Sequence, residues 1–334
     1  SMVFGVAAFV VGTMTEERLP LLIMALAIAL SLLSVLSLLG YLNSSIAAHV
    51  FYGTDRSYAT FKNPNQYGMV LSTTLPMIIA FAVVTSGRMQ ITAAVSAVAM
   101  LLGLILSGSK ANLLLSGANI MVLSMLIVIV YFRGQRRFLA LSVVTVLGLC
   151  ALAASVWAMT ILNPRAFELL TAFIDADRTV PSLNSRQHIY AVSWEVFIAN
   201  PMFGEGAGQT IQVEPDGELF SHSHNILLDY ARTLGVPGLV GMSVLCATVV
   251  GFAILSILAI VLLRQRNPVL RYLTIGAALG SINYVAANSS SESFGPSTSV
   301  FFWLVLFLFL FMHGRLFGAG QRVGTRSVSS GVPA

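Results

Sequence analysis

The chain has 334 residues, of which 57% are hydrophobic and only 9% are charged. A water-soluble protein of this size cannot cover its surface with so few charges, so the composition excludes a soluble enzyme. The net charge of +5 does not indicate nucleic-acid binding, because the basic residues stand in twos and threes at the ends of apolar runs. Both cysteines lie inside apolar runs, which argues against a secreted disulfide framework.

Several apolar runs are long enough to cross a membrane, which needs about 20 residues per helix. In chain order they lie near 19–42, 66–86, 89–107, 111–132, 138–162, 236–263, 270–288 and 299–313. A shorter apolar stretch at 2–13 is interpreted as the tail of one more span. The sequence therefore predicts an all-α polytopic membrane protein with about eight or nine transmembrane helices.

Charges at the ends of the spans predict how the chain is threaded. Two short arginine-rich loops belong in the cytoplasm by the positive-inside rule. Their arginines are Arg133, Arg136, Arg137, Arg264, Arg266 and Arg271. The periplasmic face then receives the segment 43–65, the turn around Lys110, the short connection 289–298 and one long loop. We expect an N-terminal bundle at 1–162, this periplasmic loop at 163–235, and C-terminal helices with a basic cytoplasmic tail at 236–334.

The long loop is expected to contain an amphipathic helix that lies on the membrane surface or on the bundle. Asn184 is the predicted N-cap, Gln187 completes a capping box, and Asn200-Pro201 ends the helix. Apolar residues follow at helical spacing, namely Ile189, Val192, Val196 and Phe197. Arg186 falls in the first turn, where free amide hydrogens and the helix dipole favour an anion such as a diphosphate. A solvated surface arginine is the alternative.

His224 stands just before the apolar run 226–234, whose helix dipole disfavours the protonated imidazole. A neutral imidazole suits a general base. Capping of the helix or a hydrogen bond to a loop carbonyl is the structural alternative. His222 and His224 indicate a metal site only weakly, because no Cys, Asp or Glu stands at ligand spacing around them.

Other polar residues of the loop and the spans have simpler interpretations. The glycine-rich stretch 204–208 predicts a turn, since it lacks the strand and helix of a nucleotide site. A solvated loop face is expected for the acids Glu205, Glu214, Asp216 and Glu218. Asp229 either orients substrate or balances Arg232. Asn112 and Asn119 are expected to hydrogen-bond between helices.

Four motifs resemble the O-antigen ligase and polymerase superfamily. His224-Asn225, a nine-residue spacer and Gly235-x-x-Gly238 match its pattern, although Leu239 stands where the family prefers threonine or valine. The other three motifs are Asn184-Ser185-Arg186 with the turn 200–206, the Asn-Pro-Asn signature within 61–68, and Ser107 to Ala111, where relatives carry a serine-arginine pair. They stand in the same order as in the family.

The resemblance implies a multi-pass enzyme of the bacterial inner membrane with an active site that faces the periplasm. Such enzymes transfer a glycan from a polyprenyl (undecaprenyl) diphosphate to a sugar hydroxyl. A ligase uses lipid A-core as the acceptor, and a polymerase uses a lipid-linked glycan. We expect no cofactor, no metal and no nucleic-acid partner.

The reaction places negative charge on the leaving diphosphate, which fixed cations stabilise. The expected catalytic residues are Arg186, Lys110 and, as the base, His224. Those expected to bind substrate are Asn225, Arg56, Lys62, Asn63 and Asn65. Lys110 replaces the family's arginine, and lysine holds phosphate as a point charge rather than with a bidentate fork.

A flippase or transporter for the same lipid-linked sugars is the alternative of another class. Such proteins tend to show internal repeats, and the sequence shows no repeat. A transporter would also tolerate the loss of His224 better than an enzyme that uses it for proton transfer.

Overall fold

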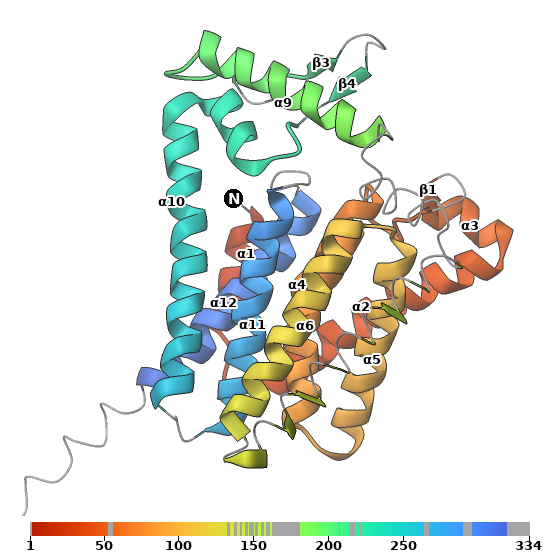
Figure 1. Cartoon of the computed structure of the whole chain (residues 1–334), viewed down its shortest axis with the longest axis vertical. Coiled ribbons are helices and arrows are strands. Elements are labelled where there is room, and N and C mark those ends of the chain that lie inside the picture. The colour runs from red at the N-terminus through yellow and green to blue at the C-terminus, as the bar shows by residue number, and fades with distance from the viewer. Residues whose placement is uncertain are drawn as a thin grey trace, which may run out of the picture.

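The computed structural model describes residues 2–52, 56–131, 181–206, 208–213, 218–220, 222–263, 267–289 and 296–318, with scattered positions between 134 and 161. These residues form helices and two short antiparallel hairpins (Figure 1). Most of the long helices run side by side along one direction, and this arrangement confirms the prediction of an all-α polytopic membrane protein.

The first half of the chain supplies helices that pack among those of the second half, with α1 against α12 and α4 against α11. Its long helices are α1 (Met2–Gly12), α2 (Leu19–Leu42), α4 (Pro64–Val84), α5 (Gly87–Leu106) and α6 (Lys110–Tyr131). The predicted connection 43–65 contains α3 (Ser44–Val50) and a hairpin of β1 (Phe51–Tyr52) and β2 (Arg56–Ser57). Asn63 caps α4, because its side chain accepts a hydrogen bond from the amide of Gln66 at 2.9 Å.

The second half begins with α9 (Pro181–Ala199), which lies across the ends of the long helices (Figure 1). A hairpin of β3 (Ile211–Val213) and β4 (Glu218–Phe220) follows, with Gln212 opposite Leu219. The chain returns to the bundle with α10 (Ile226–Leu263), α11 (Pro268–Asn288) and α12 (Pro296–Gly318). The start of α9 corrects the predicted N-cap, since Asn184 lies inside the helix. Pro181 begins it three residues earlier, a position that suits a residue with a fixed φ and no amide hydrogen.

Six helices in the described part have the length and hydropathy to cross a membrane. They are α2, α4, α5, α6, α10 and α12. The span predicted at 138–162 falls largely outside the described residues and stays a prediction. α11 covers the span predicted at 270–288, but it is less apolar than these six because it is enclosed by other helices and carries many small and polar residues.

The crossing of α4 and α11 forms the centre of the bundle. A Cβ at Gly280 would overlap the carbonyl oxygen of Thr73, and one at Gly276 would lie 2.7 Å from that of Pro76. Helices approach this closely in membranes where small residues stand four apart. The absence of side chains at these two positions therefore allows the two backbones to touch.

Hydrogen bonds between asparagines and serines also join the helices. Asn119 donates to Asn283 at 2.8 Å, Asn283 donates to Ser72 at 2.8 Å, and Ser72 bonds Asn112 at 3.2 Å. The interhelical bonds predicted for Asn112 and Asn119 are confirmed. The chain of bonds links α4, α6 and α11, so polar groups that would be costly in lipid satisfy one another.

α10 bends where the predicted boundary between the long loop and the C-terminal helices lies. Gly235 has φ +67° and ψ −154°, a conformation that only glycine adopts without strain, and Pro237 follows two residues later. The segment 226–234 therefore lies at an angle to the long membrane-crossing part of α10 (Figure 1).

Replacing Gly280 with alanine should destabilise the protein, because the new methyl group must push α11 away from α4. Overpacking of this kind costs about 1–3 kcal/mol. We expect the thermal unfolding midpoint in detergent to fall by several degrees. Gly251→Ala is the matched control, since a Cβ there meets no atom within 4 Å, and its midpoint should stay or rise. Equal midpoints for the two variants would contradict this packing.

Candidate functional site

Three positive side chains from distant segments come together at the end of the bundle that α9 covers. Lys110 is the first residue of α6, and the charges of Arg56, from β2, and Arg186, from α9, act on its ammonium group. Arg186 acts on His224 as well. Because like charges repel, such a cluster is suited to an anion with several negative charges.

Arg56 is held in place by hydrogen bonds to two of the motifs. Its Nη2 donates to Asn65 Oδ1 at 2.7 Å, and its Nε donates to the carbonyl oxygen of Ser107 at 3.1 Å. Asn112 in turn donates to the carbonyl oxygen of Asn65 at 3.2 Å and to Ser109 at 2.8 Å. The 43–65 connection, the start of α4 and the turn before α6 therefore form one polar unit.

His224 lies in the loop that leads into α10, with its backbone in the left-handed region at φ +52°. This conformation is uncommon for a residue other than glycine, and surrounding contacts maintain it. Tyr190 of α9 donates to the carbonyl oxygen of His224 at 3.3 Å. Asn225 caps α10 by accepting from the amides of Leu227 and Leu228 at 3.0 and 3.1 Å.

The imidazole of His224 is neutral near pH 7. Burial lowers its pKa to about 4, aided by His222, whose ring centroid lies 4.4 Å away, and by the positive charge of Arg186. Asp229 opposes this shift. The direction agrees with the prediction, but burial rather than the helix dipole is the main cause.

Asp229 and Arg232 fix the loop that contains His222, Ser223 and His224. One carboxylate oxygen of Asp229 accepts from the amide of Ser223 at 2.9 Å, from its hydroxyl at 3.2 Å and from Arg232 at 3.3 Å. Arg232 is 1% exposed and also pairs with Glu205. Of the two roles left open for Asp229, balancing Arg232 is therefore observed. The expected solvated position of Glu205 is wrong, because a buried cation requires a partner.

The glycine-rich turn after α9 packs against the bend in α10. The amide of Val236 donates to the carbonyl oxygen of Pro201 at 2.7 Å, and that of Glu205 donates to the backbone carbonyl oxygen of Arg232 at 2.9 Å. Gly204 and Gly235 both have positive φ, and a Cβ on either would overlap the other segment's backbone. The predicted glycine-rich turn therefore packs directly against the start of the predicted Gly-x-x-Gly motif.

The expected site residues divide into two groups. Arg56, Lys110, Arg186 and His224 converge, and Asn65 supports Arg56. Of the other three, two cap helices and one is exposed. Asn63 caps α4, Asn225 caps α10 and donates to the carbonyl oxygen of Ser289 at 3.2 Å, and Lys62 is exposed. Arg186 lies in the second turn of α9, so the expected help from the helix terminus does not apply.

Sequence reasoning missed Tyr190 and Ser223 and undervalued Arg232. An ion pair at i,i+3 within an apolar helix start, Asp229 with Arg232, was the available signal, since such charges are buried only when paired. Nothing in the sequence marks Tyr190. Within the described part of the chain, no three His, Cys, Asp or Glu side chains gather as a metal site would require.

Comparison with known families adds independent information. Residues 95–243 match a protein-family model described as O-antigen ligase. The matched segment contains Lys110, Arg186, His224 and the glycine pair of the α10 bend, while Arg56 and the Asn-Pro-Asn signature lie outside it. A search of curated proteins found no match to the chain.

Arg232→Met should destabilise the protein strongly, because it leaves Glu205 and Asp229 with their charges partly buried and without this cation. Breaking a buried pair costs about 3–5 kcal/mol. The control is Arg315→Met, which breaks a 3.7 Å pair with Glu16 whose side chains are about half exposed. An exposed pair contributes only about 0–1 kcal/mol. Thermal unfolding of both variants in detergent checks this, and a similar loss in both would refute the ranking.

Proposed function

Because residues 95–243 match the O-antigen ligase family model, we propose that the chain belongs to the O-antigen ligase and polymerase superfamily and transfers a glycan from a polyprenyl diphosphate to a sugar hydroxyl. The family implies ligase-like glycan transfer in the assembly of surface polysaccharide. The observation that carries the finer proposal is the convergence of Arg56, Lys110 and Arg186 beside His224.

The cations serve the leaving group. When the bond between the anomeric carbon and the diphosphate oxygen breaks, its electron pair stays on that oxygen. Positive groups that are already in place stabilise this charge without reorganisation, which is why one such donor contributes about 10²–10³-fold in rate. Arg56 is oriented by Asn65 and Ser107, so its guanidinium group is fixed before the substrate arrives.

His224 serves the acceptor. Its neutral imidazole takes the proton of the sugar hydroxyl while that oxygen attacks the anomeric carbon. The low pKa of His224 in the free enzyme makes its imidazole a weak base. A bound diphosphate, however, brings negative charge to the same cluster. That charge opposes the effect of Arg186 and raises the basicity of His224 when the donor is in place.

The site's position suits a donor that arrives within the membrane. The cluster lies at the end of the bundle, where α6 begins and α9 crosses it (Figure 1). We propose that this end faces the periplasm and that the protein resides in the bacterial inner membrane, as the arginine-rich loops predict. The donor's diphosphate would then meet the cations at the membrane surface.

Two acceptors fit the proposal. Lipid A-core makes the protein a ligase, and a second lipid-linked glycan makes it a polymerase. The His224-Asn225 motif is typical of ligases, while Lys110 and Leu239 leave room for a polymerase. A flippase would share the cations but not the need for a neutral, buried histidine beside them.

Glycan transfer by purified protein in liposomes tests the proposal. With polyprenyl-diphosphate oligosaccharide and either acceptor, we expect Arg186→Ala to lower kcat/KM by about 10²–10³-fold. His224→Gln should lower it by about 10²–10⁴-fold. Arg88→Ala is the matched control, since this exposed arginine stands at the opposite end of α5 from Ser107 and should not affect the rate.

The productive acceptor distinguishes ligase from polymerase. If neither acceptor receives the glycan, or if the Arg186 and His224 variants match wild type, the transferase proposal fails and the flippase takes its place.

The pH dependence should report His224 directly. Because its pKa is lowered to about 4, the base stays neutral as pH falls below the ordinary histidine value, and kcat/KM should decline only below about pH 5. The acid limb of kcat should lie at higher pH, since the bound diphosphate raises the pKa of His224. His224→Gln should lack both limbs. A kcat/KM limb near pH 6.5 would contradict this environment.

A further inference from the structure

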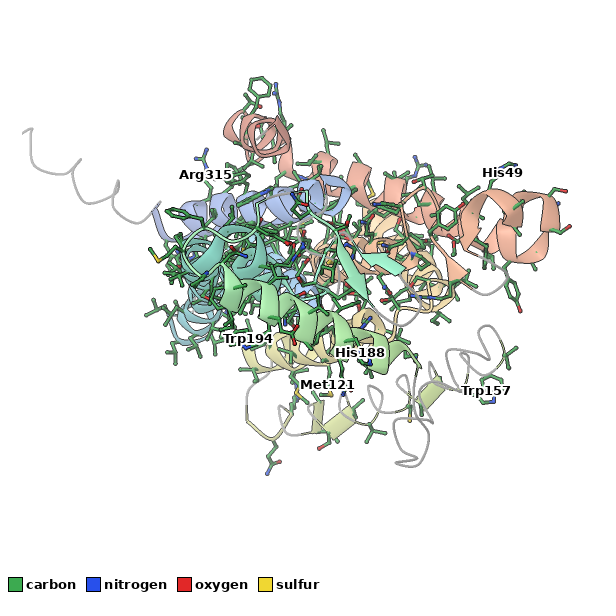
Figure 2. All side chains as sticks on the ribbon, turned by 90° about the horizontal axis from the view of Figure 1, so that it is seen from above. His49, Met121, Trp157, His188, Trp194 and Arg315 are labelled. Atoms are coloured by element: carbon green, nitrogen blue, oxygen red, sulfur yellow. The ribbon has the colours of Figure 1, made fainter. Side chains whose placement is uncertain are left out.

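The helix α9 has three different sides. Ile189, Ser193 and Phe197 are spaced four apart and are buried against the rest of the molecule. Trp194 and Ile198 follow about 100° around the helix and are exposed. Polar His188 and Glu195 are exposed on a third side. Figure 2 looks down on α9 and labels His188 and Trp194.

The exposed apolar side continues past the end of the helix. Met202 and Phe203 occupy the turn that follows Ala199, and together with Trp194 and Ile198 they are 52–80% exposed. The ring centroids of Trp194 and Phe197 lie 5.3 Å apart, so a buried aromatic side chain supports the exposed one. We name Trp194, Ile198, Met202 and Phe203 the apolar flank.

The apolar flank meets the lipid-facing surface of α10. Val236 donates its amide to Pro201, and a Cβ on Gly235 would overlap the backbone of Met202. From this point α10 runs into the membrane with apolar side chains exposed at Val236, Val240 and Val244. The flank therefore stands at the level where α10 enters the membrane.

From this continuity we propose that the apolar flank inserts into the boundary between lipid headgroups and acyl chains. Tryptophan prefers this boundary, because its ring is apolar and its N–H needs a polar partner. The occupant is lipid rather than a protein partner, since the flank extends a surface that already faces lipid and His188 and Glu195 turn toward water on the other side. α9 is then held by the bundle on one side and by the membrane on another.

Quenching of tryptophan fluorescence tests this proposal without reference to glycan transfer. The chain has three tryptophans, so Trp157→Phe and Trp303→Phe leave Trp194 as the sole emitter. In liposomes, lipids brominated at carbons near the headgroup should quench Trp194 by more than about half. Lipids brominated deep in the chain should quench it less, because interfacial helices lie about 5–10 Å into the headgroup and acyl boundary. Acrylamide in the water should have little effect.

The matched control moves the tryptophan by one position, with Trp194→Phe and Glu195→Trp in the same background. Because Glu195 is on the water-facing side, this tryptophan should be quenched by acrylamide and not by brominated lipid. If these combined substitutions prevent folding, the difference in fluorescence between wild type and the single variant Trp194→Phe supplies the same signal. Quenching of Trp194 by acrylamide alone, or by neither agent, would overturn the proposal in favour of water or a protein partner.

Discussion

The structure around α9 and the start of α10 depends on the ion pairs of the buried guanidinium group of Arg232. A buried charge is costly without partners, so the fold must bring carboxylates to it. Glu205 comes from the turn after α9, and Asp229 comes from the start of α10. Asp229 also accepts a hydrogen bond from the amide of Ser223, which stands between His222 and His224 in the chain. The ion pairs that hold the turn after α9 against α10 therefore also fix the position of these histidines. The positions of α9 and of the proposed base are thus set together.

A second constraint acts inside the membrane, where polar groups must satisfy each other. The chain of bonds through Asn119, Asn283, Ser72 and Asn112 joins α4, α6 and α11, and Asn112 continues it to Asn65. Asn65 accepts the hydrogen bond that orients Arg56. The position of the cation cluster therefore depends on how the helices pack. Arg56 is held by the start of α4 and the end of α5, and Asn112 connects Asn65 to α6.

The extent to which sequence predicted this arrangement follows from the range of each signal. Hydrophobic run length is local, so the membrane-crossing parts of the described helices were predicted within a few residues, while the span at 138–162 stays a prediction. The order of the motifs indicated His224, Arg186 and Lys110. The predicted start of α9 was wrong because the sequence offers two helix starts, a capping pattern at Asn184 and a proline at 181. Local rules favour both and do not decide between them. The pairing of Glu205 with Arg232 and the bond from Tyr190 to His224 join residues 27 and 34 positions apart, and no periodicity records such contacts.

The same charges that prepare the site for a donor also weaken the proposed base while the site is empty. Arg186 acts on both Lys110 and His224, so the cluster lowers the proton affinity of the imidazole before any diphosphate is present. A diphosphate that neutralises these cations removes that effect, because one anion interacts favourably with the guanidinium group and with a protonated imidazole. In the proposed mechanism, an acceptor hydroxyl or a water molecule that enters before the donor would meet a histidine with little tendency to take its proton. In the proposed mechanism, donor binding would therefore favour activation of the acceptor by changing the charge beside His224, while burial and His222 continue to lower the pKa of the imidazole.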